Sequence, residues 1–257
     1  MLPHRLHDAI LSADLRSYRA GLPVPELRLE TMDALSVDYA PFDHIETEAE
    51  LVLVGLTPGR AQAANAIEAM AAALRVGRPV DEALATAKRS ASFSGPMRAN
   101  LLALLDRIRV PALFRRARAA EFFEHGARVH FTSALRYPVY VDGRNYSGTP
   151  NPLRHPLLVS MIDRYLAEEA ERIGHAIWVP LGGHAEAALL RLSQQGRLDR
   201  TRILAGLPHP SGANAERIAY FLDRKPRESL SSKTNPDALD AARKRLEAQV
   251  SERLNFR

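Results

Sequence analysis

The stretch LVLVGLTPG, residues 51–59, gives the first indication of the fold of this chain. Four consecutive apolar residues, 51–54, predict a short strand that is buried on both faces, and Gly55 and Pro58 end it. The Ala-rich segment that follows, residues 61–74, predicts a helix. A buried strand, a polar loop and a helix in this order are typical of an α/β protein with a parallel sheet.

The same alternation continues along the rest of the chain. Further strands are predicted at residues 129–135, 176–181 and 202–207. Helices are predicted at residues 3–20, from residue 79 onward, and at residues 96–108, 153–173, 183–192, 214–222 and 237–254. Three stretches are expected to lack regular structure: the Pro-punctuated residues 22–47, the polar residues 88–95 and the Gly-, Asn- and Pro-rich residues 136–152.

Strands that alternate with helices indicate the α/β class, with helices on both faces of the sheet. We therefore expect a three-layer α/β/α arrangement around a four-stranded, mostly parallel sheet. Nothing in the pattern suggests a second core, so we expect one domain over residues 1–257.

Composition excludes several kinds of site. The chain has no Cys, which excludes disulfides, thiolate metal sites and iron–sulfur clusters. No apolar run approaches the roughly 20 residues that cross a membrane, and no signal peptide is evident, so we expect a cytoplasmic protein without a membrane partner. The net charge of +5 permits a polyanionic partner, but a solvated, Arg-rich surface explains it equally well.

A second polar loop, HPSGAN at residues 209–214, follows the apolar run 203–207. An imidazolium can stabilise or protonate a leaving anion, and a Ser hydroxyl with backbone amides can hold a phosphate. The alternative is a surface turn, and in either case Ser211 or Asn214 is expected to cap the next helix.

The first loop, Gly55 to Gly59, lets the backbone approach a ligand closely, and the start of the following helix favours anions. It lacks the Gly-Lys-Ser/Thr ending of a nucleotide-binding P-loop, and by itself it is compatible with an ordinary strand–helix turn. Loops at the carboxyl ends of parallel strands converge on one crevice, so the two loops can build one site.

Together these motifs resemble the uracil-DNA glycosylase superfamily. Its members carry a Gly-x-x-Pro-Gly type loop after the first sheet strand and a His-Pro-Ser-x-x-Asn/Ser type loop after the last one. Three intermediate stretches are also similar and occur in the same order: ASFSG at 91–95, VHFTSALR at 129–136 and WVPLG at 178–182. The resemblance covers about residues 50–222 and leaves the N-terminal helix and the charged C-terminal helix as extensions.

The resemblance implies a role for each motif. Phe93 would stack on the flipped base, and His209 would stabilise the anion that develops on it, with Thr57 at the position that activates water in several families. Ser211 would hold a DNA phosphate, and Ser133 stands where the family reads uracil with an Asn. The residues implied in ligand binding are Gly55, Leu56, Pro58, Gly59, Phe93, Ser133, Ser211, Gly212, Ala213 and Asn214.

Three departures from the family pattern bear on function. Thr57 cannot ionise near neutral pH, and Ser133 cannot offer the donor-plus-acceptor pair of an amide. Ala213 stands where several members insert a Leu into the base stack, and it is too small to fill the gap. Because unstacking costs less in single strands and at mismatches, we expect DNA with a damaged base, single-stranded or mispaired, as the partner.

The resemblance implies removal of uracil or another deaminated or damaged base by hydrolysis of its N-glycosidic bond, without a cofactor or a metal. One alternative is a catalytically silent nucleic-acid-binding member of the same fold. Another is a small-molecule hydrolase or phosphate-ligand binder that uses the same crevice.

The expected long loop carries three tyrosines, Tyr137, Tyr140 and Tyr146, among Arg136 and Arg144. Aromatic rings interleaved with cations can line a groove for nucleic acid. A loop that folds over the site with its tyrosines packed inward is equally compatible with this sequence.

Overall fold

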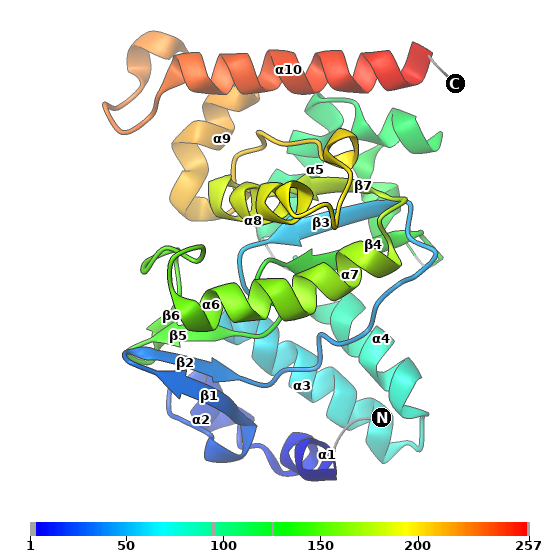
Figure 1. Ribbon diagram of the computed structural model, residues 1–257, viewed down its shortest axis with the longest axis vertical. Helices are drawn as coiled ribbons and strands as arrows, with labels where there is room; N and C mark the ends of the chain where they lie inside the picture. Colours follow the sequence, from blue (N-terminus) through cyan, green and yellow to red (C-terminus); the bar gives the residue numbers. More distant parts are fainter. Residues whose placement is uncertain (1–3, 94–95, 125, 256–257) are drawn as a thin grey trace. The chain divides into compact units, whose positions relative to one another are not determined.

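The computed structural model describes residues 4–93, 96–124 and 126–255 (Figure 1). The protein is mixed α/β, and its chain divides into two compact units. Unit 1 comprises Met1–Ile45, Leu56–Ser94 and Phe131–Arg172, and unit 2 comprises Glu46–Gly55, Gly95–His130 and Ile173–Arg257. Because the chain passes repeatedly between them, neither unit is a continuous segment. The expectation of a single domain stays a prediction.

The parallel sheet has three strands in the order β4-β3-β7. β3, Leu51–Gly55, is central, and every one of its residues is buried, as the apolar run predicted. It pairs in parallel with β7, Ile177–Pro180, with Leu51 opposite Ile177. β4, Val129–Ser133, begins in unit 2 and ends in unit 1. The strands predicted at 51–54, 129–135 and 176–181 are therefore confirmed.

The fourth strand predicted at 202–207 is wrong. This segment follows a short 3-10 turn, Arg200–Arg202, and joins β7 and the residue after it only through two isolated parallel bridges, Trp178 to Ile203 and Leu181 to Leu207. Gly206 lies between the bridges with a φ of +122°, outside the range of a β-strand. Its missing Cβ also allows a close approach, because a Cβ there would lie 3.0 Å from that of Ala242.

Unit 1 holds an antiparallel sheet that the sequence pattern did not predict. Its strands, in the order β1-β2-β5-β6, are β1 Arg28–Met32, β2 Leu35–Asp38, β5 Val139–Val141 and β6 Arg144–Asn145. The first two lie in the stretch expected to lack regular structure because β1 is an exposed edge strand without apolar alternation. The last two form a hairpin inside the expected long loop, at an Asp142-Gly143 turn with both φ angles positive.

The helices of unit 1 are α1 His4–Ser12, α2 Leu15–Arg19, α3 Arg60–Arg75, α4 Val80–Ala91, α6 Pro156–Met161 and α7 Ala167–Arg172, with a 3-10 turn at Pro25–Leu27 and a π-helical turn at Ile162–Leu166 joining α6 to α7. The helix expected over 3–20 is broken because the Asp14 side chain accepts from the amides of Arg16 and Ser17 and starts α2. The loop expected at 88–95 is helical as far as Ala91, because the Lys88 side chain is buried rather than solvated.

Unit 2 contains α5 Pro96–Arg107, α8 Gly183–Gln194, α9 Ala215–Phe221 and α10 Pro236–Asn255, with 3-10 turns at Val110–Phe114, Ala119–Phe123, Arg200–Arg202, Gly212–Asn214 and Arg227–Ser229. The long α10 contacts α9 and the first of these turns, and it buries Leu246 and Val250 (red in Figure 1). In the part of the chain that the structure describes, no helix has the length and apolar character to span a membrane.

Candidate functional site

The first loop is tied to the segment that follows β4, and the residues that join them, 56 and 57 on one side and 135–139 on the other, lie in unit 1. The Leu56 carbonyl accepts a hydrogen bond from the amide of Leu135 at 2.9 Å. The Thr57 hydroxyl donates to the Tyr137 carbonyl at 3.1 Å and accepts from the amide of Val139 at 3.2 Å. The segments that follow β3 and β4 therefore lie side by side within this unit, and the convergence of the first and second loops on one site stays a prediction.

These bonds give Thr57 a structural role. Its hydroxyl hydrogen is used by Tyr137, so Thr57 can only offer a remaining lone pair to a water molecule. The hydroxyl links the first loop to the β5–β6 hairpin, whose strand β5 begins at Val139. A direct role of Thr57 in catalysis stays a prediction.

The start of α3 is already occupied by side-chain oxygens. The Gly59 amide donates to Oε1 of Gln62, and the Arg60 amide donates to Oδ1 of Asn145, each at 3.0 Å. The Arg60 guanidinium lies 4.1 Å from the ring centre of Tyr140. The hairpin is thus docked on the start of α3 by Asn145, and a phosphate would have to displace that side chain to reach the Arg60 amide.

The tyrosines of this segment pack inward. Tyr137, Tyr140 and Tyr146 are 7%, 1% and 5% exposed, so they cannot stack on bases in a groove. Arg136 is buried as well and bonds Glu168 and Glu169 at 3.0 Å each. The interpretation of Arg136 and the three tyrosines as the lining of a nucleic-acid groove is wrong, because each of these four side chains is buried and bonds a partner within the protein, whereas Arg144 is exposed.

The other unit 1 residues implied in the site are Phe93 and Ser133. Phe93 is buried, with its ring centre 5.9 Å from that of Phe131 and with a φ of +46°. Ser133 ends β4 and is half-buried. The remaining residues of the Phe93 motif, 94 and 95, lie outside the described residues. The roles of Phe93 in stacking and of Ser133 in base recognition stay predictions.

The second loop lies in unit 2, where its neighbours hold His209 in place. Nδ1 of His209 accepts from the amide of Ser211 at 3.2 Å. The side chain of Asn100, on α5, donates to the Pro210 carbonyl at 2.9 Å. Gly182 has a φ of +89°, and a Cβ on it would lie 3.0 Å from the Cβ of His209. The glycine before α8 therefore leaves the space that His209 fills.

His209 is a neutral imidazole with its hydrogen on Nε2. Burial lowers the pKa of His209 below its ordinary value of 6.5. The Ser211 amide can only donate, so the Nδ1 that it contacts carries no hydrogen. The group available to a ligand is thus an uncharged Nε2–H donor rather than the imidazolium considered from sequence.

The rest of the loop is a 3-10 turn, Gly212–Asn214, in which Gly212 and Ala213 are exposed. The Asn214 side chain donates to the Ser211 hydroxyl at 3.3 Å and accepts from Arg217 at 2.8 Å. Among the described residues, neither Ser211 nor Asn214 makes a side-chain capping bond, so the expected capping role is wrong. Their side chains bond each other and Arg217 instead.

Sequence reasoning missed a second polar cluster, in unit 1. Asp43 accepts from the hydroxyls of Tyr137 at 2.5 Å and Tyr39 at 2.9 Å. Lys88 donates to the His44 carbonyl at 2.7 Å and lies 3.8 Å from Glu169. Burial lowers the pKa of Lys88 to about 8.

A weak signal for this cluster was present in the sequence. On α4, Lys88 is flanked by Ala87 and Ala91, both buried, so it lies next to the apolar stripe of the helix. Long cationic side chains at such positions usually reach solvent, and the sequence alone does not show that Glu169 makes burial possible.

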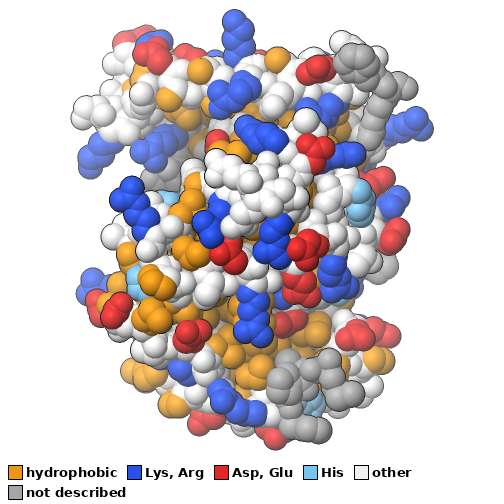
Figure 2. All heavy atoms as spheres, viewed as in Figure 1, with side chains coloured by type: hydrophobic (Ala, Val, Ile, Leu, Met, Phe, Trp, Pro, Cys, Tyr) orange, Lys and Arg blue, Asp and Glu red, His pale blue; other side chains and the backbone are white. Residues whose placement is uncertain are grey.

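The residues described at 4–93, 96–124 and 126–255 contain no group of three or more His, Asp or Glu side chains placed to hold a metal ion. On the face shown in Figure 2, Lys and Arg side chains are interspersed with Asp and Glu side chains. A partner that binds this face would meet mixed charge rather than one basic field.

Fold and loops together define a mixed α/β protein with one polar loop after a central parallel strand and a second, histidine-bearing loop before α9. The chain is 34% identical over 211 residues to the uncharacterized protein YoxB of Bacillus subtilis (strain 168). The match covers 80% of this chain and 82% of YoxB, so the chain belongs to the same family as YoxB. No protein-family profile matches the chain. No solved structure matches it either.

Proposed function

We propose that this protein removes uracil or another deaminated or damaged base from DNA by hydrolysis of the N-glycosidic bond, on a divergent uracil-DNA glycosylase-like fold. In this proposal the fourth strand of a three-layer α/β/α fold is reduced to the two bridges at Ile203 and Leu207. The order of the motifs along the chain and the local geometry of the second loop support it.

The observation that carries the proposal is the donor at His209. In the reaction, water forms a bond to the sugar C1′, the C1′–N bond breaks, and the base leaves with the electron pair while the water loses a proton to solvent. A neutral Nε2–H placed at an oxygen of the departing base stabilises that charge without giving up a proton. Burial of His209 strengthens such a contact because water competes less there.

The Ser211 side chain supplies a second contact. It is half-buried, next to His209, and a serine hydroxyl is a common partner of a DNA phosphate. The net charge of +5 adds a general attraction to DNA that salt would screen. We expect affinity for DNA to fall as salt rises from low to moderate concentration.

A second candidate function is binding of nucleic acid without catalysis. The hydrogen bonding of Thr57 favours it. Thr57 aligns with the residue that activates water in several families, but its hydroxyl hydrogen is donated to the Tyr137 carbonyl. The occupied start of α3 does not separate the two functions, because Asn145 already takes the Arg60 amide that a phosphate would need in either of them. In an active enzyme these same features predict slow excision that depends mainly on stabilising the leaving base.

The two functions are separated by excision assays on oligonucleotides that carry uracil, hypoxanthine, xanthine and other lesions in single-stranded, mismatched and fully paired form. Base excision predicts abasic sites with at least one lesion, fastest in single-stranded or mismatched DNA, because Ala213 is too small to fill the gap in a stack. Salt-dependent binding without any abasic product would establish the silent alternative. Absence of salt-dependent binding would exclude both and leave a small-molecule ligand.

A further inference from the structure

The second loop belongs to a chain of hydrogen bonds that begins outside its motif, at Arg217 on α9. NH1 of Arg217 donates to Oδ1 of Asn214 at 2.8 Å. Nδ2 of Asn214 faces the Ser211 hydroxyl oxygen at 3.3 Å, and the Ser211 amide faces Nδ1 of His209 at 3.2 Å. The four residues are therefore connected in series, and all of them lie in unit 2.

The two ends of this series fix the direction of every bond in it. A guanidinium can only donate, so the Asn214 atom that it contacts must be the oxygen. The amide nitrogen of Asn214 then faces Ser211, whose hydroxyl oxygen must accept. At the other end, a backbone N–H can only donate, so Nδ1 of His209 must accept.

We infer that Arg217 is a positioning residue that orients the second loop as a cradle of two hydrogen-bond donors, the Ser211 hydroxyl for a phosphodiester and Nε2–H of His209 for an oxygen of the base. Once Asn214 donates to its oxygen, the Ser211 hydroxyl keeps its own hydrogen for a ligand, and His209 keeps Nε2–H. No acceptor for either hydrogen is found among the residues that the structure describes. The inference rests on the proposed function for the identity of the ligand, but not for the direction of the bonds.

Arg217 is itself held from its other side. Its NH2 donates to the Lys233 carbonyl at 3.2 Å. The segment that carries Lys233 is fastened to α9 by Glu216, which accepts from the hydroxyls of Ser231 at 2.6 Å and Thr234 at 2.5 Å. The hydrogen bond from Lys225, together with those from Ser231 and Thr234, holds the pKa of Glu216 far below its usual range, so Glu216 remains a charged anchor. The cradle is thus braced before a ligand arrives.

The isosteric substitution Asn214→Asp tests the direction of the bonds. The carboxylate keeps the contact with Arg217 but can only accept, so the Ser211 hydroxyl must donate to it and loses the hydrogen that it offers to a ligand. Affinity for a fluorescein-labelled single-stranded oligo-dT, measured by anisotropy, should fall by about 10-fold or more, as for loss of one hydrogen bond to a charged group.

The added negative charge of N214D would also repel DNA, and the S211A background separates the two effects. If bond direction matters, N214D costs much less affinity in S211A than in the wild type, because the hydroxyl is already gone. Equal costs in both backgrounds would show that N214D acts by repulsion alone and would overturn the inference. Failure of the wild type to bind the oligonucleotide would overturn it as well.

Arg217 is tested with Arg217→Met, Arg217→Lys and the matched control Arg224→Met, which removes another exposed arginine of unit 2. R217M should weaken binding several-fold, R217K should restore part of it because lysine is also an obligate donor, and R224M should match the wild type. If R217M binds like R224M, Arg217 does not position the loop.

Nitrogen NMR of the His209 ring gives a readout independent of any reaction. The wild type and R217K should show the hydrogen on Nε2 alone, whereas R217M should show a mixture with the Nδ1–H form, because a second loop that Arg217 no longer holds moves the Ser211 amide away from Nδ1 in part of the molecules. An unchanged ring in R217M would contradict the inference. If the wild type releases no base from any oligonucleotide, the proposed function fails, while the ring and the N214D/S211A comparison still decide this inference.

Discussion

At the scale of the residue, the position of His209 depends on a glycine in another part of unit 2. Gly182 combines a φ of +89° with a distance of 3.0 Å between the Cβ that it lacks and the Cβ of His209. Each condition alone excludes most side chains, and together they leave glycine as the residue that fits. The histidine and the glycine thus form one structural unit although 26 positions, 183–208, separate them.

Gly182→Ala should therefore damage both stability and the second loop. The backbone of Gly182, with φ +89° and ψ 163°, lies in a region almost restricted to glycine and costs an alanine at least about 1 kcal/mol, and relief of the contact must move His209. We expect a loss of about 1–2 kcal/mol in the free energy of unfolding, measured in urea, together with slower base release. The adjacent Gly183→Ala is the control, because nothing lies within 4 Å of its missing Cβ. Equal effects of the two substitutions would contradict this account of Gly182.

At the scale of the element, Thr57 joins the first loop to the β5–β6 hairpin through two hydrogen bonds. Thr57→Val keeps the shape but leaves the amide of Val139 without its acceptor. We expect Thr57→Val to lower the free energy of unfolding by about 1–3 kcal/mol, as for an unsatisfied buried group. Thr57→Ser retains the hydroxyl and should stay close to the wild type. If T57V and T57S unfold alike, the hydroxyl does not hold the hairpin.

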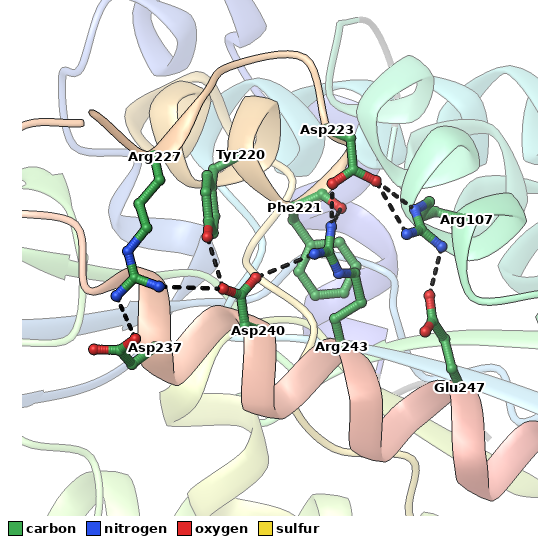
Figure 3. A network of polar contacts seen from close by, with 9 residues as sticks. All are labelled: Arg107, Tyr220, Phe221, Asp223, Arg227, Asp237, Asp240, Arg243 and Glu247. Atoms are coloured by element: carbon green, nitrogen blue, oxygen red, sulfur yellow. Dashed lines mark hydrogen bonds and ion pairs between the residues drawn. The ribbon is translucent and has the colours of Figure 1, made fainter. Parts of the chain in front are cut away.

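The C-terminal helix α10 is held by a network of charged side chains as well as by Leu246 and Val250 (Figure 3). Arg243 is its centre, with contacts to Asp223 at 2.5 Å and Asp240 at 3.1 Å. The network continues from these two carboxylates to five further side chains: Arg107, Tyr220, Arg227, Glu247 through Arg107, and Asp237 through Arg227. Charged side chains on one side of this helix therefore form ion pairs, so the helix is not surrounded by solvent on every side.

Arg243→Met should weaken the attachment of α10. Isolated exposed ion pairs contribute little, but Arg243 is mostly buried and bridges two carboxylates, so we expect a loss of about 1 kcal/mol in the free energy of unfolding. Added salt should reduce the difference from the wild type by screening the pairs. Lys244→Met, at the exposed neighbouring position, should change stability much less. A salt-independent difference would show that Arg243 acts through packing alone.

At the scale of the whole molecule, the sequence predicted the parallel part of the fold well because its signals are strong. β3 is a continuous apolar run between polar loops, and α3 follows it as expected. The antiparallel sheet of unit 1 was not predicted, because β1 is exposed and β5 and β6 are three and two residues long. Strands that short take their stability from tertiary partners, and a local pattern does not reveal those partners.

In the candidate site, too, the sequence predicted what depends on neighbouring residues and not what depends on tertiary partners. His209, Ser211 and Asn214 are neighbours in sequence, so their association needed only the motif. Contacts between distant positions, such as Gly182 with His209 or Tyr137 with Asp43, have no local signal. The protonation state of His209 could not be predicted from the sequence either, since the neutral state depends on burial and on the Ser211 amide.

The buried charges and tyrosines of unit 1 predict an unusual dependence of stability on pH. The pKa of Lys88 falls to about 8 in the folded protein, through burial partly offset by Glu169. Between pH 8 and its ordinary pKa of 10.5, the unfolded chain binds more protons, so stability rises with pH. Burial raises the pKa of Tyr140 and of Tyr146 to about 12, so above pH 10 the folded protein binds more protons and stability falls.

We therefore expect the free energy of unfolding to increase from pH 7.5 to about pH 9.5 and to decrease above pH 10. Urea unfolding at a series of pH values measures this directly. Lys88→Met should remove the rise and leave the later fall, since the tyrosines are unchanged. A rise that persists in K88M would assign it to another group.

The central claim is that His209 stabilises a base as it leaves a sugar. Single-turnover measurement of abasic sites, with enzyme in excess over single-stranded DNA that contains uracil, hypoxanthine or xanthine, tests it most directly. The wild type should release at least one of these bases, His209→Ala should be slower by about 10²-fold or more, and the exposed His175→Ala should match the wild type. Release by H209A at the wild-type rate, or no release of any base by the wild type, would contradict the claim.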